Sequence, residues 1–293
     1  MINKQTRRSA LKNMITGTVA FGAAGTLSSF TMDVKSNAEL KGNINHSVCP
    51  WCYKELTLDE LCVAAKKIGI KGIDLLGPKD WPTVKKYGLD SPMCNGAEIN
   101  LTDGFNDKKF HQTLIKNYTD MIPLVSAAGY TNLICFSGSR RGMDDETGWS
   151  NCVEGLKPLL SLAEKYKVVL VMELLNSKIT HRDYQCDRTS WGVELAERLG
   201  SENFKLLYDI YHMQIDEGDI IHNITENHQY IAHYHTGGVP GRHEIDDTQE
   251  LYYPAIMRAI KDTGYKGFVA QEFIPAQPDK IASLKKAIEI CDV

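Results

Sequence analysis

Four apolar runs of this sequence each end in a polar residue that could bind a metal ion. The runs are VVLVMELLN, FKLLYDIYHMQ, YIAHYHTGG and GFVAQEF, and these polar residues are Glu173, Asp209, His235 and Glu272. Two glutamates, one aspartate and one histidine form a hard, mostly oxygen ligand set, which suits Mn²⁺, Mg²⁺ or Co²⁺ better than structural zinc. We therefore predict one divalent metal site. The alternative is four unrelated residues that cap strands.

The spacing of these four residues indicates the fold that would bring them together. Successive members lie roughly 30 residues apart, the length of one strand–helix unit when about 250 residues make eight units. In a (β/α)8 barrel the carboxyl ends of the strands meet at one mouth. The sequence therefore predicts an α/β fold with a single (β/α)8 TIM barrel over residues 39–293.

Short apolar runs alternate with helical patterns, and no linker divides the chain. The predicted strands are Asn45–Cys49, Gly72–Leu76, Ser91–Asn95, Asn132–Phe136, Val168–Leu174, Phe204–Ile210, Ile231–His235 and Gly267–Phe273. The predicted helices are Leu58–Gly69, Trp81–Tyr87, Lys108–Ala128, Cys152–Tyr166, Ser190–Leu199, Asp219–Glu226, Glu250–Thr263 and Pro278–Ile290. The long loop after the fourth strand, SGSRRGMDDETGW, is of the kind that often carries function. We expect Arg140 and Arg141 to pair with acidic residues of this loop, namely Asp144, Asp145 and Glu146.

Polar residues next to the predicted ligands could bind a small polyoxygenated substrate. Asn176 follows the fifth strand, His212 follows the sixth, and Arg242 and Glu244 lie in the loop after the seventh. Arg242 can bind a carboxylate or phosphate through two parallel hydrogen bonds, which a lysine does less well. The alternative for Arg242 is an ordinary solvated surface arginine. We predict that these four residues bind substrate.

Residues 1–38 have the order of an export signal. Paired Arg7-Arg8 precedes the mildly apolar stretch Met14–Leu27, which is too short to span a bilayer, and small residues follow at Ser36–Ala38. This order is typical of a twin-arginine signal, so we expect a periplasmic protein. The alternative is an amphipathic or disordered tail. No other segment of the sequence is suited to cross a membrane.

The charge of the chain disfavours nucleic acid as a partner. The formal net charge is −4, and removal of the basic leader would make the remaining chain more acidic. Nucleic-acid binding depends mainly on neutralising phosphates, which an acidic body does poorly. We expect a small-molecule substrate and no membrane span in the mature chain, and we leave a homo-oligomer open.

Cys49-Pro50-Trp51-Cys52 has the spacing of a redox CxxC motif. However, no thioredoxin-like order of strands and helices surrounds it. We expect instead a loop after the first strand that carries Trp51 over the barrel mouth. The oxidation state of the two cysteines is left open.

Several segments together resemble a known family. They are LLYDIYHMQIDEGD, HYHTGGVPGRHE, the QEF of the eighth strand and the ME..N of the fifth. They resemble the hydroxypyruvate isomerases and, more broadly, the xylose isomerase-like barrels, which include ketose 3-epimerases, inosose dehydratases and endonuclease IV. The resemblance covers roughly Asn45 to the C-terminus. It implies that the four predicted ligands bind one divalent metal, that the two glutamates also act on the substrate, and that His212 and Arg242 contact substrate oxygens.

Such a site can move a proton on a carbon beside a carbonyl. The metal would polarise the carbonyl oxygen and stabilise an enediolate, while Glu173 and Glu272 remove and return the proton. Return to the neighbouring carbon is isomerisation, return to the opposite face is epimerisation, and loss of water gives a dehydratase of the inosose or dehydroshikimate type. Hydroxypyruvate isomerases usually have Gln at the position of His235, whereas ketose epimerases have His. The substrate, hydroxypyruvate or a related hydroxy-carbonyl compound or sugar, therefore stays open.

Overall fold

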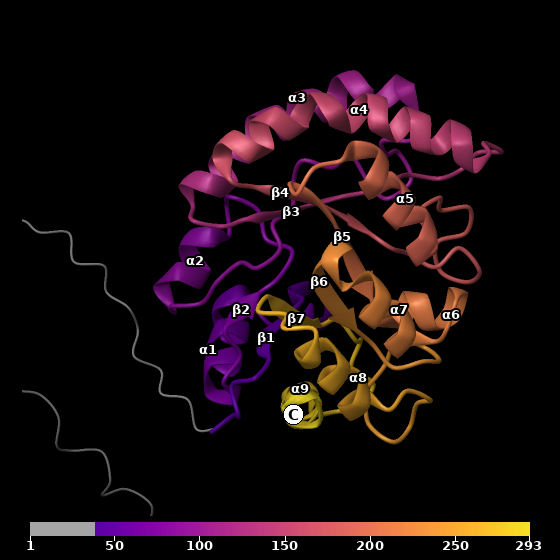
Figure 1. The fold of residues 1–293 in the computed structure, drawn as a ribbon. Coiled ribbons are helices and arrows are strands. Elements are labelled where there is room, and N and C mark those ends of the chain that lie inside the picture. Colours follow the sequence, from indigo (N-terminus) through magenta and orange to yellow (C-terminus); the bar gives the residue numbers. More distant parts are fainter. Residues whose placement is uncertain (1–38) are drawn as a thin grey trace, which may run out of the picture. The chain divides into compact units, whose positions relative to one another are not determined.

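Seven parallel strands form one sheet, in the order β2-β1-β7-β6-β5-β4-β3, in a computed structural model of the protein (Figure 1). The structure describes residues 39–293, so the predicted export signal at residues 1–38 lies outside the described residues. The strands are β1 (Asn45–Val48), β2 (Gly72–Ile73), β3 (Asn132–Cys135), β4 (Val169–Glu173), β5 (Phe204–Asp209), β6 (Ile231–Thr236) and β7 (Phe268–Gln271).

The two edges of this sheet are joined by the predicted third strand, Ser91–Asn95. This segment is not a regular strand, and Pro92 within it has no N–H to donate to a ladder. Its backbone nevertheless bridges both edges, because Cys94 pairs in parallel with Leu76 beyond β2 and with Leu133 in β3. The sheet therefore curls into a closed ring, and the predicted α/β TIM barrel is confirmed.

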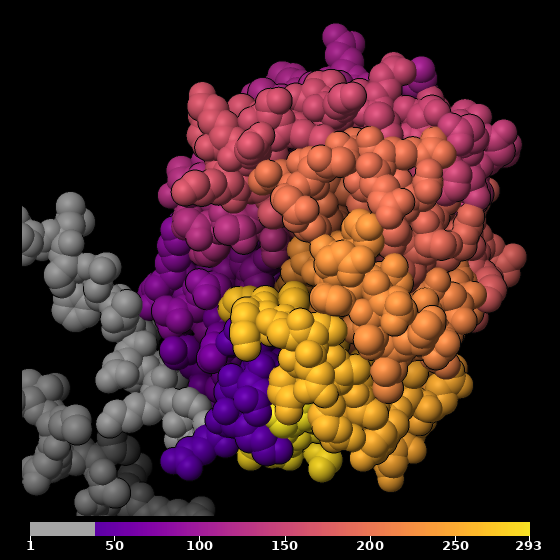
Figure 2. Space-filling view, viewed as in Figure 1, coloured from indigo at the N-terminus to yellow at the C-terminus, as the bar shows by residue number. Residues whose placement is uncertain are grey.

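Helices cover the outside of the strands. The helices are α1 (Leu58–Ile68), α2 (Trp81–Lys86), α3 (His111–Ala127), α4 (Asp145–Tyr166), α5 (Thr189–Leu199), α6 (Ile210–Asp216), α7 (Ile220–Asn227), α8 (Tyr253–Asp262) and α9 (Lys280–Cys291). Three short 3-10 helices are η1 (Pro50–Tyr53), η2 (Lys108–Phe110) and η3 (His228–Tyr230). The first and last described segments lie side by side (Figure 2), because β1 pairs along its length with β7.

Two helices, α4 and α6, depart most from the sequence prediction, and both begin at an aspartate cap. Helix α4 begins well before Cys152, because the Asp144 side chain accepts the N–H of Thr147 and starts the helix inside the loop. Helix α6 was not predicted. It begins directly after β5, because Asp209 Oδ1 accepts the N–H groups of Tyr211 and His212. Asp209 is therefore both a strand end and a helix cap.

The barrel interior is apolar in its lower layers and polar at the carboxyl ends of the strands. Strands β4, β5 and β6 contribute buried residues along most of their length, as expected of parallel strands covered on both faces. Buried polar residues at the ends of these strands include Glu173, Asp209 and His235. Among residues 39–293, no helix has both the length and the apolar character that crossing a bilayer requires.

Candidate metal and active site

The structure brings the four predicted ligands together at the mouth of the barrel. Glu173 ends β4, Asp209 ends β5, His235 is the penultimate residue of β6, and Glu272 directly follows β7. The parallel register pairs Asp209 with His235, which aligns the ends of their strands. One ligand atom from each residue lies within 4.8 Å of all the others, and all four side chains are buried.

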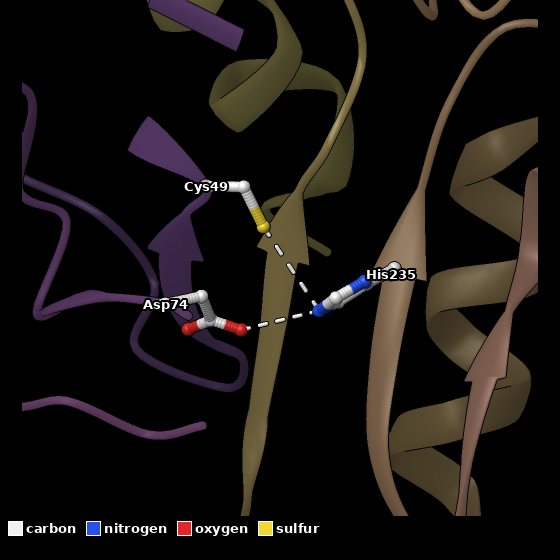
Figure 3. Close-up of side chains that lie close together, drawn as sticks. All are labelled: Cys49, Asp74 and His235. Carbon is white, nitrogen blue, oxygen red and sulfur yellow. Dashed lines mark hydrogen bonds and ion pairs between the residues drawn. The ribbon is translucent and has the colours of Figure 1, made fainter. Parts of the chain in front are cut away.

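The two ring nitrogens of His235 face different clusters. Nδ1 lies 2.6 Å from Glu272 Oε2 and 3.5 Å from Glu173 Oε1, yet this buried nitrogen makes no hydrogen bond within the described residues. Nε2 lies 3.3 Å from Asp74 Oδ2 and 4.0 Å from Cys49 Sγ (Figure 3). A proton on Nε2 can be donated to Asp74, which leaves the lone pair of Nδ1 directed toward the carboxylates.

Asp74 also holds a second imidazole of the same strand. Its Oδ2 lies 2.5 Å from His233 Nε2, and both side chains are fully buried. The nearby histidine side chains hold the pKa of Asp74 well below its usual range, even though burial alone would raise it. Asp74 is therefore an anion inside the barrel that can fix the orientation of His235.

Arg242 connects three of the polar groups at the mouth. Its Nη2 lies 2.8 Å from Asp209 Oδ2 and 2.5 Å from Glu272 Oε2, and its Nη1 donates to His212 Nε2 at 2.7 Å. Its Nε donates to the backbone carbonyl of Glu272 at 3.0 Å. The guanidinium also lies over the ring of Trp51, 5.4 Å from its centroid. Arg242 is therefore a structural member of the cluster and not a solvated surface arginine.

Asn176 and His212 support one another. His212 Nδ1 lies 2.6 Å from the side-chain amide of Asn176, whose oxygen accepts the N–H groups of Ile179 and Thr180. Burial and the charge of Arg242 hold the pKa of His212 well below its usual range, so its ring is neutral. His212 faces the cavity at the mouth, whereas Asn176 is fully buried behind it.

The structure does not bring Glu244 into this cluster. Its carboxylate accepts the N–H groups of Ala276 and Gln277 and the hydroxyl of Ser283. These bonds join the loop after β6 to the start of α9, and Glu244 lines a separate cavity there. The sequence prediction of a substrate contact followed from nearness to Arg242 in the chain, but the side chain points the other way.

A cavity of about 440 Å³ opens above the cluster. Glu173 and Glu272 line it, whereas Asp209 and His235 lie fully buried beneath. Trp51 donates its indole N–H to Glu272 Oε1 at 2.7 Å, so the loop after β1 reaches over the mouth as the sequence predicted. The remaining lining residues are Leu75, Asn95, Glu98, Ile99, Asn100, Leu101, Ile134, Phe136, Leu175, His181, His212 and Arg242.

The carboxyl groups of the cluster differ in their electrostatics. Burial raises the pKa of Asp209 to about 7 against the opposing charge of Arg242. Burial also raises the pKa of Glu173, and the nearby side chain of His235 opposes the rise. Burial acts on Glu272 in the same way, but His235 and Arg242 outweigh it and hold its pKa well below the usual range. Glu173 and Glu272 both line the cavity, and Glu272 is the one of the two that is held as an anion.

These donors fit a divalent cation. Three buried carboxylates have a single guanidinium as their fixed positive partner, and buried charge without compensation is costly. The unpartnered Nδ1 of His235 points into the same space. Glu173, Asp209, His235 and Glu272 would hold the ion through oxygens and one neutral imidazole, as the hard divalent metals prefer.

The cysteines of the first loop do not have the surroundings of a redox pair. All eight cysteines of the chain are buried and free. Burial and the charge of Glu272 raise the thiol pKa of both Cys49 and Cys52, whereas reactive thiols have a lowered pKa. This agrees with the prediction that the loop serves to place Trp51.

The paired arginines of the long loop lie outside the mouth cavity. Arg140 forms ion pairs with Asp145 of its own loop, as predicted, and with Asp187. Arg141 instead pairs with Asp103 and Asp107 of an earlier loop.

Sequence reasoning missed the polar groups that come from the ends of the second and third predicted strands. Asp74 follows the two-residue strand β2, and Asn95, Glu98 and Asn100 follow the segment that closes the barrel. In the run GIDLL the acid lies between apolar residues, and this buried acid within a predicted strand was the signal that could have revealed Asp74.

Comparison with known proteins agrees with this geometry. The profile of the xylose isomerase-like TIM barrel family matches residues 63–291. A putative hydroxypyruvate isomerase of Homo sapiens is 32% identical over 42% of this chain, and the match spans 44% of that protein. The hydroxypyruvate isomerase of Escherichia coli (strain K12) is 29% identical over 72% of this chain and 85% of its own length.

Solved structures share the fold. An AP endonuclease of family 2 from Brucella melitensis superimposes with a TM-score of 0.73 and 22% identity, over 82% of this chain and 96% of that one. A D-psicose 3-epimerase from Clostridium cellulolyticum H10, solved with D-tagatose, gives a TM-score of 0.67 and 18% identity, over 85% of this chain and 100% of that one. At these identities the structures support the architecture alone. The match of the family profile across most of the barrel shows that the chain belongs to the xylose isomerase-like TIM barrel family.

Proposed function

We propose that this protein is a divalent-metal-dependent isomerase that moves a proton beside the carbonyl of a small hydroxy-carbonyl compound or sugar. The observation that carries the proposal is that only two of the four predicted ligands line the cavity. Asp209 and His235 are fully buried and do not line the cavity, whereas Glu173 and Glu272 do. Two carboxyl groups that face one cavity can act as acid and base on one substrate.

The bound cation would act as a Lewis acid for negative charge that develops on the carbonyl oxygen of the substrate. The protein groups do the rest. Glu272, held ionised by Arg242 and fixed by the indole N–H of Trp51, is placed to accept a proton from carbon. Glu173, whose pKa is raised by burial, is placed to return one. His212 and Arg242 border the same cavity and can orient substrate oxygens.

The position at which the proton returns decides the product. Return to the neighbouring carbon gives the isomer, as in hydroxypyruvate isomerases, and return to the opposite face gives the epimer, as in ketose 3-epimerases. A lyase of the inosose or dehydroshikimate dehydratase type would use the same first step and then lose water. The products of the reaction, examined by NMR, separate these alternatives.

The experiment begins with the purified protein loaded with Mn²⁺, Mg²⁺ or Co²⁺, with metal content measured by elemental analysis. Ketoses, aldoses, inososes and hydroxypyruvate are incubated in D₂O, and exchange of the proton beside the carbonyl is followed by NMR. Glu173→Gln and Glu272→Gln should each lower exchange at least 100-fold, since general acid–base catalysis typically contributes about 10²–10⁴-fold. The matched control is Glu226→Gln, an exposed residue of α7. Near-wild-type exchange by a metal-loaded Glu173→Gln or Glu272→Gln variant would refute the two-glutamate mechanism.

A further inference from the structure

We infer that the substrate is an uncharged sugar or sugar derivative, and not a keto acid or a sugar phosphate. This inference rests on the proposed function, because it concerns the same cavity. It depends on three features of the mouth: the contacts that its one arginine already makes, the balance of charges that line the cavity, and the apolar side chains of the lining.

The first feature is that Arg242 has no free pair of donors for a substrate anion. It is the only lysine or arginine that lines the cavity among the described residues. Its Nη2 serves Asp209 and Glu272, its Nη1 serves His212, and its Nε serves a backbone carbonyl. Binding a carboxylate or phosphate through two parallel hydrogen bonds would require breaking these contacts. One remaining N–H can still meet a hydroxyl or carbonyl oxygen.

The second feature is the charge of the lining. Glu98 adds a fourth carboxylate to those of Glu173, Asp209 and Glu272. A divalent ion and the guanidinium together offset three of these charges, so the occupied cavity stays negative. Burial and the charge of Arg242 lower the pKa of His181. Both ring nitrogens of His212 already face partners, namely Arg242 Nη1 and the side-chain amide of Asn176. An anionic substrate would therefore enter a cavity that has no free cationic side chain to pair with its charge.

Other cations near the mouth do not change this balance. Arg140 is paired with Asp145 and Asp187, and Arg141 is paired with Asp103 and Asp107. Neither arginine lines the cavity. Arg182 is the nearest candidate, because it follows His181 in the chain, but it is exposed and does not line the cavity either. Arg182 is included in the test below.

The third feature is the mixed character of the lining. Leu75, Leu101, Ile134, Phe136 and Leu175 contribute apolar side chains to it, and Asn95, Glu98 and Asn100 contribute amide and carboxylate groups. An apolar surface can pack against the C–H face of a sugar, while the polar groups can bind its hydroxyls. The volume of about 440 Å³ also lies in the range of roughly 300–1,000 Å³ common for small-molecule sites. A three-carbon acid would leave most of it to water.

The test uses pairs of compounds that share the reacting centre and differ in charge. Dihydroxyacetone and hydroxypyruvate have the same hydroxymethyl ketone, and D-fructose and D-fructose 6-phosphate form a larger pair. Proton exchange in D₂O by the metal-loaded protein should give kcat/KM at least 100-fold higher for the neutral member of each pair. An equal or higher value for hydroxypyruvate or the phosphate would overturn the inference.

Two variants test the cause of the selectivity. Glu98→Lys places a cation in the lining and should shift the neutral-to-anionic ratio at least tenfold toward the anion, whereas Glu226→Lys on exposed α7 should leave the ratio unchanged. A ratio that does not respond to Glu98→Lys would contradict the electrostatic cause. Turnover of the anionic compounds that disappears in Arg182→Ala would show that Arg182 supplies the missing cation, which also overturns the inference.

A binding measurement separates failure of this inference from failure of the proposed function. If the metal-loaded protein exchanges protons in none of the compounds, the proposed function fails. The inference is then decided by calorimetric titration of the metal-loaded protein with xylitol and with xylonate, which differ by one carboxylate. Tighter binding of xylitol supports a neutral ligand, and tighter binding of xylonate refutes it.

Discussion

Asp74→Asn should weaken metal binding although Asp74 is not a predicted ligand. The carboxylate is fully buried and lies 3.3 Å from His235 Nε2 and 2.5 Å from His233 Nε2. It can therefore accept one hydrogen bond from each ring. An asparagine amide can accept through its oxygen, but its NH₂ can also donate to Nε2. In that case the ring proton moves to Nδ1 and blocks the nitrogen that faces the carboxylates.

The size of the effect follows from the role of a group that orients a metal-binding histidine. Loss of such a partner typically lowers metal affinity about 10–100-fold, which corresponds to about 1.4–2.7 kcal/mol of binding free energy. The variant should also lose some stability without metal, because hydrogen bonds to charged groups contribute about 1.5–3 kcal/mol each. The two effects can be measured separately, because the orientation of His235 affects the Kd for the metal and the lost hydrogen bonds affect the free energy of unfolding.

The assay is competition for Mn²⁺ against a chelator of known affinity, together with thermal unfolding of the metal-free protein. Asp90→Asn is the matched control, because Asp90 is an exposed aspartate in the neighbouring segment that pairs with β2. Excess metal should restore activity to Asp74→Asn if the histidine is merely misoriented. An unchanged Kd for Mn²⁺ with lowered stability would show that Asp74 is only structural, and the account of His235 given above would be wrong.

Three further outcomes follow from the contacts at the mouth. Glu244→Gln should lower the free energy of unfolding by about 1–3 kcal/mol and leave kcat/KM of the folded protein near the wild-type value. A loss of kcat/KM without a loss of stability would instead show that Glu244 contacts the substrate. Arg242→Lys should lower kcat/KM on a neutral substrate at least tenfold, because one ammonium cannot serve Asp209, His212 and the Glu272 carbonyl together; unchanged kinetics would contradict this. The protein should not reduce insulin in a thiol assay, because its thiols are buried and their pKa is raised, and measurable reduction would refute that assignment.

The sequence was sufficient to predict the barrel and the gathering of Glu173, Asp209, His235 and Glu272, because both depend on the same pattern. A parallel strand buried on both faces must be apolar, so an acid at its end, as at Glu173 or Asp209, stands out against its neighbours. The regular spacing then orders the strands without any knowledge of their contacts. The convergence of these four residues at one end of the barrel was therefore predictable from strand ends alone.

The remaining features depend on side-chain direction and on short elements, which the pattern does not encode. Strand β2 has only two residues, so Asp74 was predicted to lie inside a strand and not at its end. Glu244 is close to Arg242 in the chain, but its carboxylate turns toward the start of α9. Helix α6 was hidden because Asp209 ends β5 and caps the helix in the same step. In each case a local contact sets the position of the side chain or helix, and the periodicity of apolar residues does not record such contacts.

The position of Arg242 links metal binding to substrate choice. Three carboxylates buried in one place would repel one another in the metal-free protein, and the guanidinium between Asp209 and Glu272 reduces that repulsion. The same contacts occupy the donors that could otherwise bind a substrate anion. A residue that helps the ligand cluster to form before metal arrives therefore removes the cation that a keto acid or a phosphate would need. In this barrel the balance of charge beneath the cavity limits which compounds can use the space above it.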